Sequence, residues 1–280
     1  SSGGGLSVGT GTGSNFVAGA VTATTGAVNV AVSKDVIAGA IDATTSATVS
    51  AAQGAVTLAN ITAKSGDLKI VGKTAVKTGD VTGNATVDLV SESGTLESSA
   101  VNAGGVAKLA GASGIRLASI RGGAVDATSS AGSVAVTGGV TSTTAGVKLD
   151  GRDGVTSGAI DAATSATVTA AQGAVTLANV AAKSGDLKIV GKNTVKTGDV
   201  TGSAGVELAS DSSALDAGND AIISPAAANI GHFLADLRFS GFRMRREQGA
   251  GCHDHTGLAK ATLRHIQSKP SLLNGVAAIG

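Results

Sequence analysis

The sequence predicts an all-β fold, a parallel β-helix (β-solenoid) of about ten twenty-residue coils followed by a non-repetitive C-terminal tail. The stretch ITAKSGDLKIVGKTAVKTGD at 61–80 returns almost unchanged at 180–199. Within such a unit, apolar side chains alternate with polar ones in three short groups, and turn-forming residues lie between the groups. A short unit repeated at constant length is typical of a solenoid, and alternation at period two is typical of a β-strand.

The chain opens with a Gly-rich segment, residues 1–20, which includes Gly3–Gly5 and an alternation of Gly and Thr from Gly9 to Gly13. Nucleotide-binding loops are also rich in Gly, but they lie between a strand and a helix. No helical pattern follows, so an opening coil is the favoured interpretation.

The repeats occupy residues 21–223. Successive coils start twenty residues apart, except for one step of nineteen from Val101 to Ile120. Six consecutive steps span 119 residues, and at that offset 41–100 matches 160–219, so a block of six coils has been duplicated. The coils start at Val21, Ile41, Ile61, Val81, Val101, Ile120, Val140, Ile160, Val180 and Val200.

Each coil is expected to add one short strand to each of three stacked sheets, with a rise of about 4.8 Å per coil. Alternate side chains of a strand point to opposite faces, so one apolar set per strand should fill the interior. In the coil at 61–80 the residues expected to point inward are Ile61, Ala63, Leu68, Ile70 and Val76.

Charged residues at outward positions predict ion pairs between neighbouring coils. Because such pairs are exposed, each is expected to contribute about 0–1 kcal/mol and to favour register more than stability. The predicted pairs are Lys69, Lys73 and Lys77 with Asp88, Glu92 and Glu97, and Lys188, Lys192 and Lys196 with Glu207, Asp211 and Asp216.

A column of amide and carboxylate side chains, Asn179, Asp199 and Asn219, ends three successive coils. Hydrogen bonding of these side chains to the turns is the favoured interpretation. A cation site is the alternative.

Composition limits the class of function. Hydrophobic residues make up 42% of the chain but aromatic residues only 1%, so small aliphatic side chains must fill a thin core. The net charge of +1 gives no overall attraction to nucleic acid or membranes. The single cysteine rules out a disulfide within the chain, and no apolar run is long enough for a membrane-spanning helix. Without an initiating Met or a signal peptide, the chain is expected to be the middle of a longer protein.

Residues 224–280 form an atypical basic tail. Apart from Phe16, every Phe, His, Cys, Met and Pro follows Ser224, together with five of the eight Arg. Ile230, Phe233 and Leu234 have helical spacing. Three interpretations stay open: a separate C-terminal element, a disordered tail, or a frame-shifted translation product.

The tail also contains the only residues with metal-ligand chemistry that cluster in the sequence. Cys252, His253 and His255 are weak candidates for a zinc site, because adjacent residues seldom converge on one ion without a supporting fold. No cofactor is predicted. Calcium-binding nonapeptide repeats are absent, so the coils are expected to fold without calcium.

No catalytic constellation is predicted. Gly72-Lys73-Thr74 lacks the Gly spacing of a phosphate-binding loop. Asp42 and Asp161 are related by the duplication and should lie six coils apart, roughly 29 Å at the spacing of strands. A β-helix that cleaves polysaccharides is therefore the less favoured alternative, since there is also no Trp or Tyr to stack a sugar.

The segments GAIDATTSATVSAAQGAVTLAN (Gly39–Asn60) and SGDLKIVGK (Ser65–Lys73), with the degenerate coils around them from Val21 to Asn219, resemble the repeat region of filamentous haemagglutinin-like large exoproteins. The resemblance implies a right-handed parallel β-helix. It also implies export by two-partner secretion through an outer-membrane transporter, and a role in adhesion or contact-dependent interaction.

We therefore expect a non-enzymatic stalk segment of a bacterial adhesin that is secreted or held at the cell surface. Its expected partners are the outer-membrane transporter during export and, through other parts of the parent protein, molecules on host or neighbouring cells. Neither nucleic acid nor a small-molecule substrate is expected. The alternative is a passenger segment of a single-chain autotransporter adhesin, which would share the fold and differ in its exporter.

Overall fold

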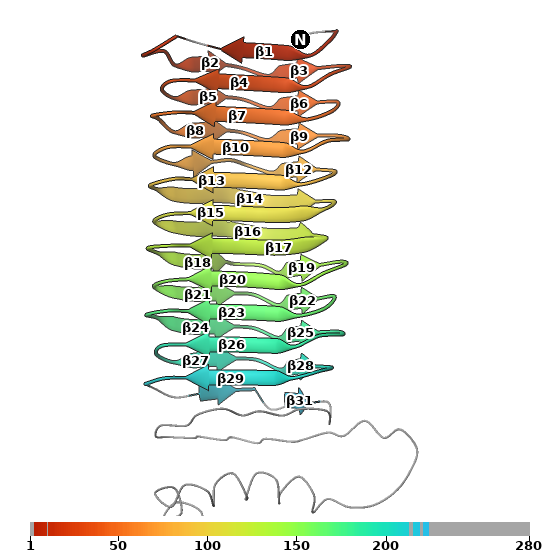
Figure 1. Ribbon diagram of the computed structural model, residues 1–280, viewed down its shortest axis with the longest axis vertical. Coiled ribbons are helices and arrows are strands. Elements are labelled where there is room, and N and C mark those ends of the chain that lie inside the picture. Colours follow the sequence, from red (N-terminus) through yellow and green to blue (C-terminus); the bar gives the residue numbers. More distant parts are fainter. Residues whose placement is uncertain (1–2, 10, 213–214, 219–220, 224–280) are drawn as a thin grey trace, which may run out of the picture. The chain divides into compact units, whose positions relative to one another are not determined.

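The computed structural model describes residues 3–9, 11–212, 215–218 and 221–223, all within one structural unit, Ser1–Arg246. In this part of the chain the regular elements are β-strands, and there is no helix that could cross a membrane. The strands stack in parallel as about ten coils that wind in a right-handed sense (Figure 1). The predicted fold class is therefore confirmed. The tail from residue 224 lies outside the described residues.

Each coil contributes a first, a second and a third strand, joined by three corners. The second strands form one sheet of eleven strands, which faces the viewer in Figure 1. This sheet consists of β1 (Leu6–Gly9), β4 (Val28–Val32), β7 (Ala47–Ala51), β10 (Leu68–Gly72), β13 (Val87–Ser91), β15 (Val106–Gly111), β17 (Ala124–Ser129), β20 (Val147–Gly151), β23 (Ala166–Ala170), β26 (Leu187–Gly191) and β29 (Val206–Ser210).

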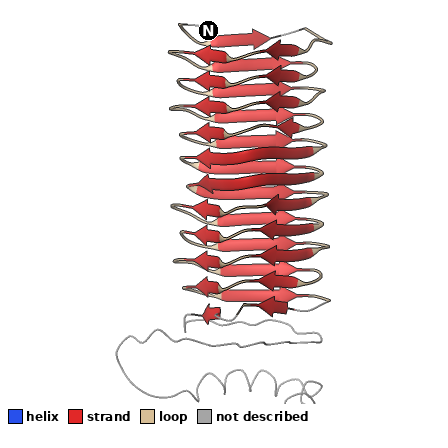
Figure 2. Ribbon diagram, turned by 180° about the vertical axis from the view of Figure 1, so that it is seen from behind, coloured by secondary structure: helices blue, strands red, loops and turns tan. Residues whose placement is uncertain are grey.

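The first and third strands form two columns of a second sheet, seen from its own side in Figure 2. The first strands are β3 (Val21–Ala23), β6 (Ile41–Ala43), β9 (Ile61–Ala63), β12 (Val81–Gly83), β19 (Val140–Ser142), β22 (Ile160–Ala162), β25 (Val180–Ala182), β28 (Val200–Gly202) and β31 (Ala221–Ile223). The third strands are β2 (Phe16–Ala18), β5 (Val36–Ala38), β8 (Val56–Leu58), β11 (Val76–Lys77), β18 (Ser133–Val136), β21 (Gly154–Ser157), β24 (Ala174–Leu177), β27 (Val195–Thr197) and β30 (Leu215–Ala217).

Two long strands, β14 (Thr95–Ala103) and β16 (Gly114–Gly122), run through the third corner and join these two columns into a single sheet of twenty strands. The neighbouring third corners contain Gly or Asn, residues that favour a turn, such as Asn60 and Gly79 before them and Gly138 after them. The corresponding positions within β14 and β16 hold Ser, Ala and Leu, so the chain stays extended there.

The Gly-rich opening segment belongs to the stack. Its strands β1 and β2 pair in parallel with β4 and β5, which are a second and a third strand of the following coil. The solenoid therefore begins before Val21, the residue at which the sequence repeat becomes regular.

Inward-facing Val, Ile, Leu and Ala side chains fill one continuous core along the stack. In the coil at 61–80, the five residues predicted to point inward are all buried, with relative exposures of 0–1%. Alternate residues of the same strands are exposed or half-buried, as in the pattern of β4. The period-two pattern therefore predicted correctly which face of each strand is buried.

The corners are not uniform. From Val28 in the second strand to Val36 in the third strand there are eight positions, and between the residues aligned with them in the next coil, Ala47 and Val56, there are nine. Eight and nine alternate through the remaining coils. The structural repeat is therefore a pair of coils, not one.

The first corner compensates for this alternation. It usually spans seven positions where the second corner is short, as from Ile61 to Leu68, and six where the second corner is long, as from Val81 to Val87. The coil that starts at Ile120 departs from this rule, because it has five positions to Val125 and one more in its third corner. The coil that starts at Val101 has only six positions to Ala107, although its second corner is short. This missing residue explains the single step of nineteen residues in the sequence.

Candidate functional site: the polar ladders outside the coils

Ion pairs connect neighbouring coils at most of the predicted positions. Nζ of Lys73 lies 2.8 Å from Oε2 of Glu92, and Nζ of Lys192 lies 3.2 Å from Oδ2 of Asp211 at the equivalent place in the second copy. The pairs Lys69–Asp88 at 3.6 Å, Lys77–Glu97 at 4.0 Å and Lys188–Glu207 at 3.0 Å are also present. Lys196 and Asp216 are aligned in register, but no ion pair joins them among the described residues.

Sequence reasoning missed a second set of ion pairs that begins one strand earlier. Lys64 Nζ lies 2.9 Å from Oδ2 of Asp42, and Lys183 Nζ lies 2.8 Å from the carboxylate of Asp161. In the sequence, each of these pairs is marked by a Lys that follows an Asp by 22 residues, which is one coil plus two positions. Each carboxylate that was weighed for catalysis therefore has a lysine partner from the next coil.

Asn and Asp side chains cap the backbone at the corners. Oδ1 of Asn179 accepts a hydrogen bond of 3.0 Å from the backbone N–H of Asp199, as the column of amides and carboxylates predicted. In the first copy, Asn60 accepts from the N–H of Asp80 at 2.8 Å, and Asp80 accepts in turn from the N–H of Ala100. Asn219, the third predicted member, lies outside the described residues.

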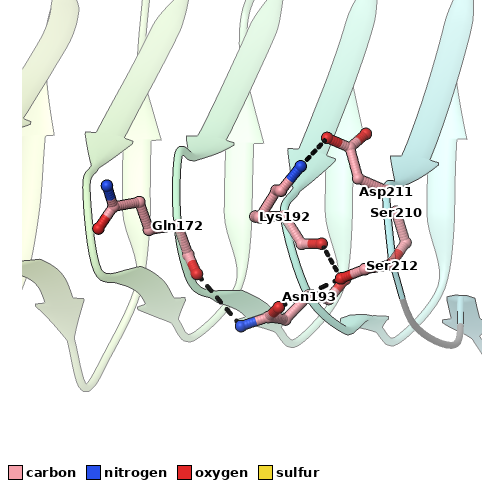
Figure 3. Close-up of polar contacts among 6 residues, drawn as sticks. All are labelled: Gln172, Lys192, Asn193, Ser210, Asp211 and Ser212. Carbon is pink, nitrogen blue, oxygen red and sulfur yellow. Dashed lines mark hydrogen bonds and ion pairs between the residues drawn. The ribbon is translucent and has the colours of Figure 1, made fainter.

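Corner residues also link three coils into one polar cluster near the end of the described stack (Figure 3). Asn193 donates from Nδ2 to the backbone oxygen of Gln172 at 3.1 Å. On its other side, the hydroxyl of Ser212 donates to the backbone oxygen of Lys192 at 2.7 Å, and that of Ser210 donates to the backbone oxygen of Asn193. The cluster contains amide, hydroxyl and ion-pair contacts within the stack, and each serves to fasten one coil to the next.

The segment Gly72-Lys73-Thr74, which lacks the spacing of a phosphate-binding loop, lies at the second corner of its coil. Gly72 is the buried last residue of β10, and a Cβ added to it would lie 2.9 Å from Cγ2 of Val76. Lys73 is occupied by its ion pair with Glu92, and strand β11 follows instead of a helix. Close packing within the coil therefore explains the Gly of this segment.

The metal candidates Cys252, His253 and His255 lie outside the described residues and stay a prediction. Within the part of the chain that the structure describes, no group of three or more His, Cys, Asp or Glu residues is arranged to hold a metal ion.

Many polar groups of the described coils thus connect one coil to the next. Their carboxylates, amides and hydroxyls bind lysines and backbone groups of adjacent coils, at intervals along the whole stack. Comparison with protein families, with curated proteins and with solved structures found no match for this chain.

Proposed function

We propose that the chain is a non-enzymatic stalk segment of an exported bacterial adhesin of the filamentous haemagglutinin-like kind. The observation that carries the proposal is the uninterrupted parallel register over about ten coils, from β1 to β31. At about 4.8 Å per coil, such a stack spans roughly 50 Å, and its length depends only on the number of coils.

Two features support a spacing role. Each coil is fastened to its neighbours by backbone ladders and by ion pairs such as Lys73–Glu92, so the stack resists bending between coils. The duplication of six coils adds length while it preserves register, because residues 41–100 and 160–219 stack in the same way. A stalk gains function directly from added length.

The proposed partners follow from this role. The parent protein would pass through an outer-membrane transporter and would contact molecules on host or neighbouring cells through other regions. The polysaccharide-cleaving alternative finds less support, because Asp42 and Asp161 belong to separate coils and each is paired with a lysine.

Export is tested with the parent protein in the cells that produce it. Protease added to intact cells should degrade the repeat region, as detected with an antibody against residues 21–212. A cytoplasmic protein serves as the control and should survive. A repeat region that is protected until the cells are lysed would contradict an exported stalk.

The spacing role is tested by removing residues 41–159 from the parent protein. Electron microscopy should show an antibody label on the distal part of the parent closer to the membrane by roughly 29 Å, six coils at the strand spacing. An unchanged label position would contradict a spacer, and turnover of acidic or neutral polysaccharides by the purified chain would favour the enzyme instead.

A further inference from the structure

Two Asn-x-Thr triplets occur within the coils, Asn60-Ile61-Thr62 and Asn84-Ala85-Thr86. This triplet is the acceptor sequence for the transfer of a sugar to the asparagine side chain, and it is used where it lies on an accessible surface loop. Both asparagines are exposed, and the triplets differ in the placement of their middle residues and in the contacts of the asparagine side chains.

The Asn84 triplet lies entirely in a corner. Strand β12 ends at Gly83 and β13 begins at Val87, so all three residues of the triplet are outside the strands. Asn84 is exposed, and its side-chain amide makes no hydrogen bond within the described part of the chain. Its Nδ2 is therefore available to a transferase.

On the side of the next coil, the corner beside Asn84 has no side chains. In the next coil the equivalent corner consists of Gly104 and Gly105, whose N–H groups donate to the backbone oxygens of Gly83 at 2.8 Å and Ala85 at 2.9 Å. This is the corner shortened by the missing residue. A sugar on Asn84 that extends toward this next corner would therefore meet glycine backbone and no side chain.

The Asn60 triplet is held in the fold. Its middle residue, Ile61, starts β9 and is fully buried in the core. The Oδ1 atom of Asn60 accepts the hydrogen bond from the N–H of Asp80 at 2.8 Å, which fixes the amide against the next coil. A transferase that must bind all three residues in an accessible loop cannot engage this triplet in the folded chain.

We propose that Asn84 is a glycosylation site of the folded chain and that Asn60 is not. In the reaction, Nδ2 of Asn84 forms a bond to the anomeric carbon of a sugar activated by a diphosphate. The bond from that carbon to the phosphate oxygen breaks, the diphosphate leaves with the electron pair, and a base of the transferase takes the Nδ2 proton. The inference and the proposed stalk function are tested separately, because a stalk without sugars would still act as a spacer.

The chain contains matched controls. Asn179 occupies the position of Asn60 in the second copy and accepts the same hydrogen bond, from Asp199 at 3.0 Å, but Ala181 stands where the triplet needs Thr or Ser. Ser203 replaces Asn84 in the second copy. Trypsin places Asn60, Asn84 and Asn179 in separate peptides, 35–64, 78–108 and 153–183.

The test is mass spectrometry of the protein isolated from the cells that produce it. The 78–108 peptide should carry the added mass of one or more sugars, and Asn84→Gln and Thr86→Ala should both remove it. An unmodified 78–108 peptide from wild-type protein would overturn the proposal.

A second experiment tests the role of the fold. The purified full chain is treated, folded or unfolded in urea and then diluted, with a soluble asparagine glycosyltransferase and a nucleoside diphosphate glucose. The folded chain should react at Asn84 alone, the unfolded chain at both Asn84 and Asn60, and neither at Asn179. A folded chain that reacts at Asn60, or that fails to react at Asn84, would contradict the structural distinction.

Discussion

Side-chain volumes inside the coils are matched to the length of the first corner. Where this corner spans seven positions, Ala or Ser at the end of the first strand precedes Val or Leu at the start of the second, as in Ala63 and Leu68. Where it spans six, the pair is smaller. These smaller pairs are Ala43 and Ala47, Ala103 and Ala107, Ala162 and Ala166, Gly83 and Val87, and Gly202 and Val206.

The shorter corner brings the two side chains closer together, which explains the Gly. A Cβ added to Gly83 would lie only 2.7 Å from Cγ2 of the fully buried Val87, and 3.4 Å from Cβ of Leu68 in the preceding coil. A larger residue in place of Gly83 therefore requires a smaller residue in place of Val87.

We predict that Gly83→Ala lowers the free energy of unfolding by about 1–3 kcal/mol, the usual effect of forcing a methyl group into a packed core. Adding Val87→Ala should recover most of this loss, because the double variant recreates the pair Ala43 and Ala47 of an earlier coil. Urea unfolding at equilibrium measures both variants. A double variant no more stable than Gly83→Ala alone would show that the two residues do not compensate each other.

At the scale of elements, corners of alternating length place some backbone N–H groups where a side chain of the neighbouring coil, and not its backbone, accepts their hydrogen bond. Asp67 is the last residue of a seven-position corner, and its Oδ1 accepts the hydrogen bond of the Thr86 N–H, 3.0 Å away, in the six-position corner of the next coil. Asp186 does the same for the N–H of Gly205 at 2.8 Å. The residue that lengthens one corner therefore caps the next.

Asp67→Ala is predicted to lower the free energy of unfolding by about 1 kcal/mol, the typical net contribution of one hydrogen bond. The amide of Thr86 should also lose protection from hydrogen exchange. Asp67→Asn retains the accepting oxygen and should keep both properties near those of the wild type. Equal losses in the two variants would mean that the charge of Asp67, and not its hydrogen bond, matters.

The sequence was sufficient to predict the coils because burial and register both depend on spacing. Alternation placed Leu68 and Ile70 inside, and a separation of about one coil placed Lys73 beside Glu92. Caps such as that of Asp67 could not be predicted, because they depend on which of two corners holds an extra residue. The constant coil length conceals that difference.

At the scale of the whole molecule, each coil contacts only its neighbours, so the stability of a solenoid is nearly a sum over adjacent coils. The duplication of six coils preserves the alternation, because an even number of coils was copied. Ile41 and Ile160 consequently have equivalent settings, since both begin coils with a six-position first corner. The stack should therefore tolerate the loss of one copy.

We predict that the chain without residues 41–159, in which Ala40 is joined to Ile160, folds and unfolds cooperatively with a stack shorter by roughly 29 Å. Val21 would pair with Ile160 as it now pairs with Ile41, so every strand keeps its inward face. Small-angle X-ray scattering measures the length and urea unfolding the cooperativity.

The matched control removes one residue more, 41–160. Asp161 then either takes the inward position of Ile41 or leaves it empty, because a shift of one residue exchanges the two faces of a strand. This variant should be clearly less stable than the chain lacking 41–159, although the two differ by a single residue. If the two deletion variants are equally stable, the two copies do not join in register. The length of the stack could then not change by whole blocks of coils, as the proposed stalk function requires.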